Sequence, residues 1–148
     1  MNQLEYDKLI HSQFKKLWDI DIKLIGEDKK MLATYGSFIT ATDVGIKAKY
    51  DNEIEKGFLY LETKELSEDK KTLKDTILVK KTKCKVWCQG NEKEFYYINR
   101  EDIVNYLNSK WKKLKNSKNY KKTESSEGVL IPVEDIEKIG GKKYKCKE

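Results

Sequence analysis

The sequence predicts an α+β protein in which helices flank one central mixed sheet of about five strands. Two patterns predict it. Apolar residues recur every three to four positions in two segments, as on one face of a helix. Between these segments, apolar residues alternate with polar ones over several short runs, as in half-buried strands. The chain has 148 residues, enough for a single domain with a core of ordinary size, which we expect to span 1–148.

The first predicted element is an amphipathic helix over residues 4–18, whose apolar residues recur at helical spacing. We expect its apolar stripe to pack on the sheet. Residues 19–26 alternate apolar and polar side chains and predict a short strand or an extended link.

The next two strands are predicted to form an antiparallel hairpin. Residues 44–50 and 58–64 both alternate, and the polar residues between them predict a connecting loop. If Tyr50 pairs with Phe58, Ile46 lies opposite Glu62. Leu59 and Leu61 then face a core.

The C-terminal half predicts further strands and two helices. Residues 76–79 are rich in strand-forming side chains, and residues 83–88 and 94–98 predict a second hairpin through Gly90-Asn91. Asn99 is a predicted cap for the following helix, because two acids occupy its first turn. Residues 128–132 predict a strand and residues 133–139 a brief helix.

A basic segment lies between these helices. Residues 109–123 contain no acid, and Trp111 and Tyr120 are interleaved with seven lysines. The lysines are Lys110, Lys112, Lys113, Lys115, Lys118, Lys121 and Lys122. Such a segment would bind phosphates by charge and bases by stacking. Equally, it is typical of a solvated helix end followed by a mobile loop, which we expect over 109–127, with a loose tail at 142–148.

Composition favours a polyanionic partner inside the cell. The formal charge is +6, and Arg100 is the only arginine, so phosphate contacts would rely on lysine. No apolar run is long enough to cross a bilayer and no secretory signal is readable, so no membrane partner and a cytoplasmic location are expected. Three cysteines do not make a disulfide framework, and free thiols fit that location.

Three residues predict a hydrolytic site. Glu62 and Lys64 are two positions apart on one predicted strand, so their side chains are expected to project the same way. In the predicted hairpin Asp43 lies about one rung beyond them. Two carboxylates beside an ammonium group are suited to metal-assisted hydrolysis.

An acid ahead of one strand and Glu-x-Lys on the next resembles the PD-(D/E)XK nuclease superfamily. The matching residues are Asp43, Glu62 and Lys64, and the order of elements matches over roughly residues 4–107. Thr42 stands where the signature has proline. The passage from strand to helix near Asn99 is similar to that of small phage-type nucleases.

The resemblance implies a restriction-endonuclease-like fold and a hydrolase that cuts DNA phosphodiester bonds. Asp43, Glu62 and the carbonyl of Thr63 would hold Mg²⁺ or Mn²⁺. Glu5 matches the helix glutamate that Holliday-junction-resolvase-like members add. Lys64 would orient the attacking water, and a homodimer is usual for members that cut both strands.

Two other functions stay open. One is a non-catalytic nucleic-acid-binding module of the same fold. The other is an interaction protein, such as a phage-encoded inhibitor, whose lysines keep it in solution. At the site itself, the alternative is a solvated Glu62 and Lys64 pair on an exposed strand face.

Overall fold

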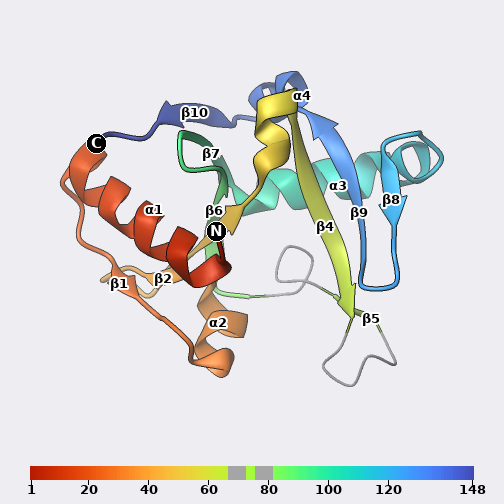
Figure 1. Cartoon of the computed structure of the whole chain (residues 1–148). Helices are drawn as coiled ribbons and strands as arrows, with labels where there is room; N and C mark the ends of the chain where they lie inside the picture. The colour runs from red at the N-terminus through yellow and green to blue at the C-terminus, as the bar shows by residue number, and fades with distance from the viewer. Residues whose placement is uncertain (67–72, 76–81) are drawn as a thin grey trace.

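The structure is a computed structural model, which describes the backbone of residues 1–66, 73–75 and 82–148 and the side chains of residues 1–63 and 82–148 (Figure 1). The fold is α+β, as predicted, but it has two sheets where one was expected. The first sheet is mixed, with the order β1 (Lys23–Leu24), β2 (Phe38–Ile39), β3 (Gly45–Tyr50), β6 (Cys84–Gly90), β7 (Glu94–Asn99) and β10 (Lys142–Lys145). The second has the order β5 (Leu73–Asp75), β4 (Phe58–Leu66), β9 (Ser126–Pro132) and β8 (Tyr120–Lys122).

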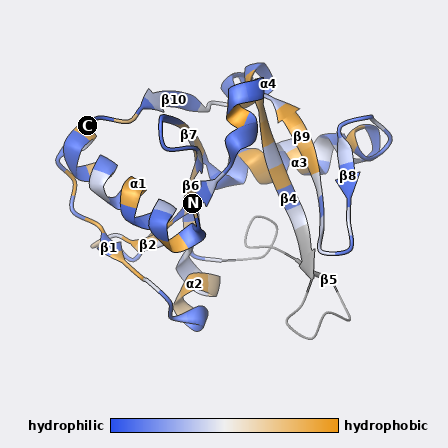
Figure 2. Cartoon of the chain, viewed as in Figure 1, coloured by the Kyte–Doolittle hydropathy of each residue, from blue (hydrophilic) through white to orange (hydrophobic). Residues whose placement is uncertain are grey.

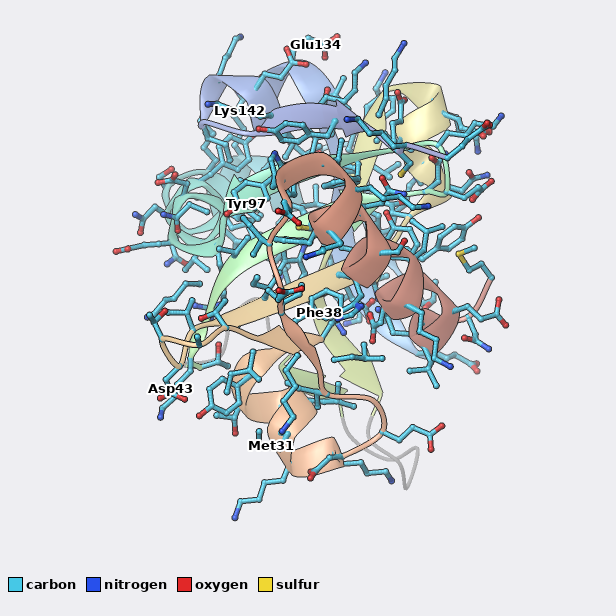
Figure 3. The ribbon with its side chains drawn as sticks, turned by 90° about the vertical axis from the view of Figure 1, so that its left-hand side faces the viewer. Met31, Phe38, Asp43, Tyr97, Glu134 and Lys142 are labelled. Atoms are coloured by element: carbon cyan, nitrogen blue, oxygen red, sulfur yellow. The ribbon has the colours of Figure 1, made fainter. Side chains whose placement is uncertain are left out.

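Helix α1 (Gln3–Trp18) covers one face of the first sheet. Tyr6, Ile10 and Phe14 are buried against apolar side chains of the strands, Phe38 among them. Figure 3 shows α1 lying across the strands that carry Phe38 and Tyr97. The predicted helix is therefore confirmed, and so is the role of its apolar stripe.

The opposite face of the first sheet packs against the second sheet and the remaining long helix. Helix α3 (Arg100–Lys115) and helix α4 (Val133–Lys138) contribute apolar side chains to this core. Hydrophobic parts of β4, β9 and α3 converge there (Figure 2). Leu59 and Leu61 are fully buried in it, as the alternation along β4 predicts.

The predicted hairpin of residues 44–50 and 58–64 is wrong. Strand β3 pairs antiparallel with β2 and parallel with β6, whereas β4 pairs with β5 and β9. The intervening residues form a 3₁₀ turn, η1 (Asn52–Lys56), in which Ile54 is buried. The apolar residues of β3 face α1, while those of β4 face the other core. The chain therefore passes from one sheet to the other instead of folding back.

Most of the C-terminal elements agree with the predictions. Strands β6 and β7 form the second hairpin, with Cys88 opposite Tyr97. Asn99 caps α3, its side chain accepting a hydrogen bond from the Glu101 N–H at 3.1 Å. Strand β9 and helix α4 lie where a strand and a brief helix were expected. The predicted strand at residues 76–79 lies outside the described residues.

Two segments differ from the expectation. Residues 109–127 are not one loop, because they contain the end of α3, all of β8 and the start of β9. The tail expected to be loose forms β10, which pairs with β7. Beyond it, Gln13 of α1 exchanges two hydrogen bonds with the backbone of Lys147, at 2.8 and 2.7 Å. Strand β8 is ordered by pairing with β9, which follows it directly in the chain, whereas β10 pairs with β7, which is distant in sequence.

The remaining α-helix is α2 (Lys29–Tyr35), which is capped by the side chain of Asp28 and has no buried residue. Among the helices in the described ranges, none has the length and apolar character that spanning a bilayer requires.

Candidate nucleic-acid interface

Asp43 lies in the turn between β2 and β3, where its backbone is left-handed with φ of 64°. Its carboxylate accepts hydrogen bonds from the Tyr35 hydroxyl at 2.6 Å and from Lys83 Nζ at 2.9 Å. These two partners, Tyr35 first, hold the pKa of Asp43 below its usual range. Figure 3 shows Asp43 at the edge of the molecule, and its side chain is 57% exposed.

Glu62 lies on β4 opposite Gly128 of β9. Its Oε2 is 3.4 Å from Lys49 Nζ, which belongs to β3 of the first sheet. A bulge follows Glu62. Glu62 pairs with Gly128 and Lys64 pairs with Glu127, so β4 advances by two residues where β9 advances by one. The bulge interrupts the regular alternation on which a shared face for Glu62 and Lys64 was predicted.

The remaining predicted site residues have structural partners of their own. Thr63 is buried, and its hydroxyl donates to the Glu127 carbonyl at 3.0 Å. Glu5 is in the first turn of α1, where its carboxylate accepts from Asn2 and its N–H donates to the Asn2 side chain, a reciprocal capping arrangement. The side chain of Lys64 lies outside the described part.

The three predicted acids therefore come from three separate places: the turn before β3, the second sheet and the start of α1. Within the described ranges, no group of three or more His, Cys, Asp or Glu side chains is placed to hold a metal ion. The predicted Mg²⁺ or Mn²⁺ site, which would use Asp43, Glu62 and the Thr63 carbonyl, therefore stays a prediction.

The seven lysines of the basic segment form what we call the lysine surface. They lie on the last turns of α3, on the turn after it and on β8, and all seven are exposed. None forms an ion pair with another described residue. Lysines at the end of α3 also stabilise the helix through its dipole. The surface is thus a concentration of positive charge without acidic partners in the described structure.

Trp111 and Tyr120, the predicted stacking residues, contact each other. Their ring centroids are 6.1 Å apart in an edge-to-face arrangement. Both rings are half-buried, and Trp111 packs against the core beneath the lysine surface. Burial raises the pKa of the Tyr120 hydroxyl.

A second group of aromatic side chains lies on the face of the second sheet that points away from the core, here called the outer face. Because paired residues in neighbouring strands share a face, the register defines its members. They are Phe58, Tyr60 and Glu62 of β4, Gly128, Leu130 and Pro132 of β9, and Lys121 of β8. Figure 1 shows α3 crossing behind β4 and β9, and no helix crossing in front of them.

Tyr60 is held at both its backbone and its side chain. Its N–H donates to Asp51 Oδ2 and its carbonyl accepts from Gln89 Nε2, each at 2.7 Å. Its ring lies against Gly128, where a Cβ atom would come within 2.7 Å of the ring and the hydroxyl. The hydroxyl is 3.1 Å from Ser126 Oγ. Burial raises the pKa of this hydroxyl.

Alternation along residues 58–64 already places Phe58 and Tyr60 on the side opposite Leu59 and Leu61. Alternation cannot reveal that Gly128 and Lys121 lie on the same face as Phe58 and Tyr60, because that depends on how β4, β9 and β8 pair in the tertiary structure. No protein-family model and no curated protein matches this sequence.

Proposed function

We propose that this protein binds nucleic acid, chiefly through contacts between lysines and backbone phosphates. The observation that carries the proposal is the lysine surface: seven exposed lysines without an ion-pair partner among the described residues. Lysine acts as a point charge toward phosphate and is less suited than arginine to bidentate hydrogen bonds with base edges. The binding is therefore expected to tolerate many sequences and to depend steeply on salt.

The distribution of charge supports the same proposal. Carboxylates gather at the end of the molecule formed by α4 and the turn between β6 and β7, where the Tyr96 hydroxyl donates to Glu137 at 2.7 Å. Glu94 and Glu134 act on the same hydroxyl, whose pKa is raised first by burial and then by these acids. In Figure 1 this end is at the top and β8 is at the right. Lysines at this end partly neutralise the acids, since Lys138 Nζ is 3.8 Å from Asp135 and Lys143 Nζ is 3.9 Å from Glu94. The lysine surface has no such ion pair with a described residue, so its charge is available to a polyanion.

The test measures binding of a fluorescent oligonucleotide by fluorescence anisotropy at increasing salt concentrations. Neutralising about five phosphates gives a slope of log K against log salt near −3.5 for a single strand. The variant carrying Lys112→Gln, Lys113→Gln and Lys115→Gln should reduce the magnitude of that slope by about 2.

The matched control removes three exposed lysines elsewhere: Lys8→Gln, Lys16→Gln and Lys30→Gln. Because it changes the net charge equally, it separates the local surface from the overall charge of the protein. Equal effects of the two triple variants would contradict the proposed surface. No binding at low salt would contradict nucleic-acid binding altogether and favour the interaction protein.

DNA cleavage with Mg²⁺ or Mn²⁺ and a homodimer stay predictions from the sequence. Binding is preferred as the proposal because the lysines that would supply it are neighbours along residues 110–122 and are all exposed, whereas Asp43, Glu62 and Glu5 each have separate partners.

A further inference from the structure

We infer that the nucleic acid is single-stranded and that one of its bases stacks on Tyr60, on the outer face of the second sheet. This inference rests on the proposed function and names its ligand class. Stacking on aromatic side chains requires an unpaired base, because the faces of paired bases are covered by their neighbours in a duplex.

The ring of Tyr60 is prepared for such a contact. It lies across Gly128, so the glycine backbone supports one side of the ring, and any larger residue at 128 would collide with it. Asp51 and Gln89 hold the Tyr60 backbone, and both are buried. A ring that is already ordered loses little conformational freedom when a base stacks on it.

A lysine of the lysine surface lies beside this ring. Lys121 is opposite Gly128 in the pairing of β8 with β9, so it lies on the outer face. Its strand is about 4.8 Å from β9, over which the Tyr60 ring extends. Lys121 is exposed. A strand whose base stacks on Tyr60 would therefore place its phosphates toward Lys121.

Phe58 provides a second aromatic side chain on the same face. It lies two residues before Tyr60 on β4, about 6.8 Å along the strand, or roughly twice the rise between stacked bases. Pro132 and Leu130 lie opposite Phe58 and Tyr60 and add apolar surface. These side chains are half-buried, and neither Phe58 nor Leu130 belongs to the two cores.

Among the described side chains, one acid lies on this face. Glu62 would repel a phosphate, but its carboxylate is 3.4 Å from Lys49 Nζ, which offsets its charge. The match between a basic rim and a polyanion, together with half-buried rings on the sheet, is what distinguishes a single strand from an apolar protein partner on this face.

The experiment compares strands with and without bases. Labelled oligo(dT), oligo(U), an abasic strand and a duplex, each of about 20 nucleotides in length, carry similar backbones and separate stacking from charge. We expect oligo(dT) or oligo(U) to bind at least about fivefold more tightly than the abasic strand and the duplex, the lower end of what one stacked base contributes. Preference between the first two decides whether the ligand is DNA or RNA.

Substitution of Tyr60 tests whether its ring is responsible for the preference for strands that carry bases. Tyr60→Leu should weaken binding of the preferred strand about fivefold or more and leave the abasic strand unaffected, whereas Tyr60→Phe should retain binding. Tyr35→Leu, on α2, is the matched control and should bind as the parent does. Circular dichroism and thermal unfolding check that each variant is folded.

Unchanged binding by folded Tyr60→Leu, or tighter binding of duplex than of single strands, would overturn the inference. In either case a salt slope reduced by the triple lysine variant would still support the proposed function. If no probe binds, both the proposed function and this inference fail.

Discussion

Asp51 and Gln89 show how single buried polar residues join the two sheets. Asp51 accepts hydrogen bonds from Gln89 Nε2 and from the Tyr60 N–H, both at 2.7 Å. It also caps η1 by accepting from Glu53 N–H at 2.9 Å. Gln89 in turn accepts from Trp87 Nε1 at 2.7 Å. Because a buried donor left without its acceptor costs about 1–3 kcal/mol, these residues stabilise the junction that presents Tyr60.

Asp7 is a buried carboxylate on the other side of the first sheet. It is 2% exposed and accepts a hydrogen bond from Gln3 at 2.6 Å. Burial raises its pKa above the ordinary value of 3.8, against the opposing effects of Ser37, Lys47 and Gln3. The folded state therefore binds more protons than the unfolded chain between pH 3.8 and the raised pKa. The free energy of unfolding therefore keeps the full contribution of Asp7 below that pH range and loses it as the pH rises through the range.

Asp7→Asn tests this assignment at the residue scale. The amide keeps an oxygen that can accept from Gln3 but carries no charge, so the variant should lose the fall in the free energy of unfolding that the parent shows across the window. Urea unfolding at several pH values measures the difference, which should be near zero below pH 3.8 and favour the variant at neutral pH. Asp21→Asn, at an exposed position, is the control. A variant less stable than the parent at neutral pH would contradict the prediction.

At the scale of elements, β10 closes one edge of the first sheet and brings Tyr144 to α1. The ring of Tyr144 meets that of Trp18 at 4.9 Å between centroids, edge to face, and those of Phe95 and Tyr97 at 6.0 and 6.4 Å. Tyr144 is half-buried, whereas the three lysines of β10 are exposed. The strand therefore links the C-terminal segment to the helix that begins the chain.

Tyr144→Ala should lower the free energy of unfolding by about 2–3 kcal/mol, less than a fully buried aromatic because the ring is half exposed. Urea unfolding measures the change. Lys142→Ala, on the same strand but exposed, is the matched control and should change stability by less than about 0.5 kcal/mol. Equal effects of the two substitutions would show that β10 contributes through its backbone and not through the aromatic contact.

The whole molecule carries an excess of positive charge, and seven of its lysines make up the lysine surface. The proposed nucleic-acid binding rests on the lysine surface, whereas the predicted cleavage would require the predicted acids to act together. These two activities are separable in one assay, because binding and cutting of plasmid DNA are read on the same gel.

The nuclease prediction is tested with supercoiled plasmid and a four-way junction, with and without Mn²⁺. A nuclease of the predicted kind would nick or cut them in Mn²⁺, stop in EDTA, and lose activity in Glu62→Ala and Lys64→Ala. Asp28→Ala, which removes only the cap of α2, should leave cleavage intact. Plasmid that is bound but stays supercoiled in Mn²⁺ would contradict the prediction.

Much of the local structure was predictable. Helical spacing identified α1, and Asn99 with its two following acids identified the start of α3. Alternation identified the buried face of β4. The hairpin failed because alternation specifies which side of a strand is apolar but says nothing about which strand lies beside it. That hairpin was also the reason for expecting Asp43 near Glu62, so this argument is lost with it, and the site itself stays a prediction.

The sequence by itself determined the charge of the protein, helices α1, α3 and α4 and the apolar side of β4, because these depend on neighbours within a few residues. Only the tertiary structure decided that β4 pairs with β9 and that Gly128 and Lys121 lie beside Tyr60. Pairing is decided by which of two cores each apolar face fills, and that depends on contacts between residues far apart in the chain.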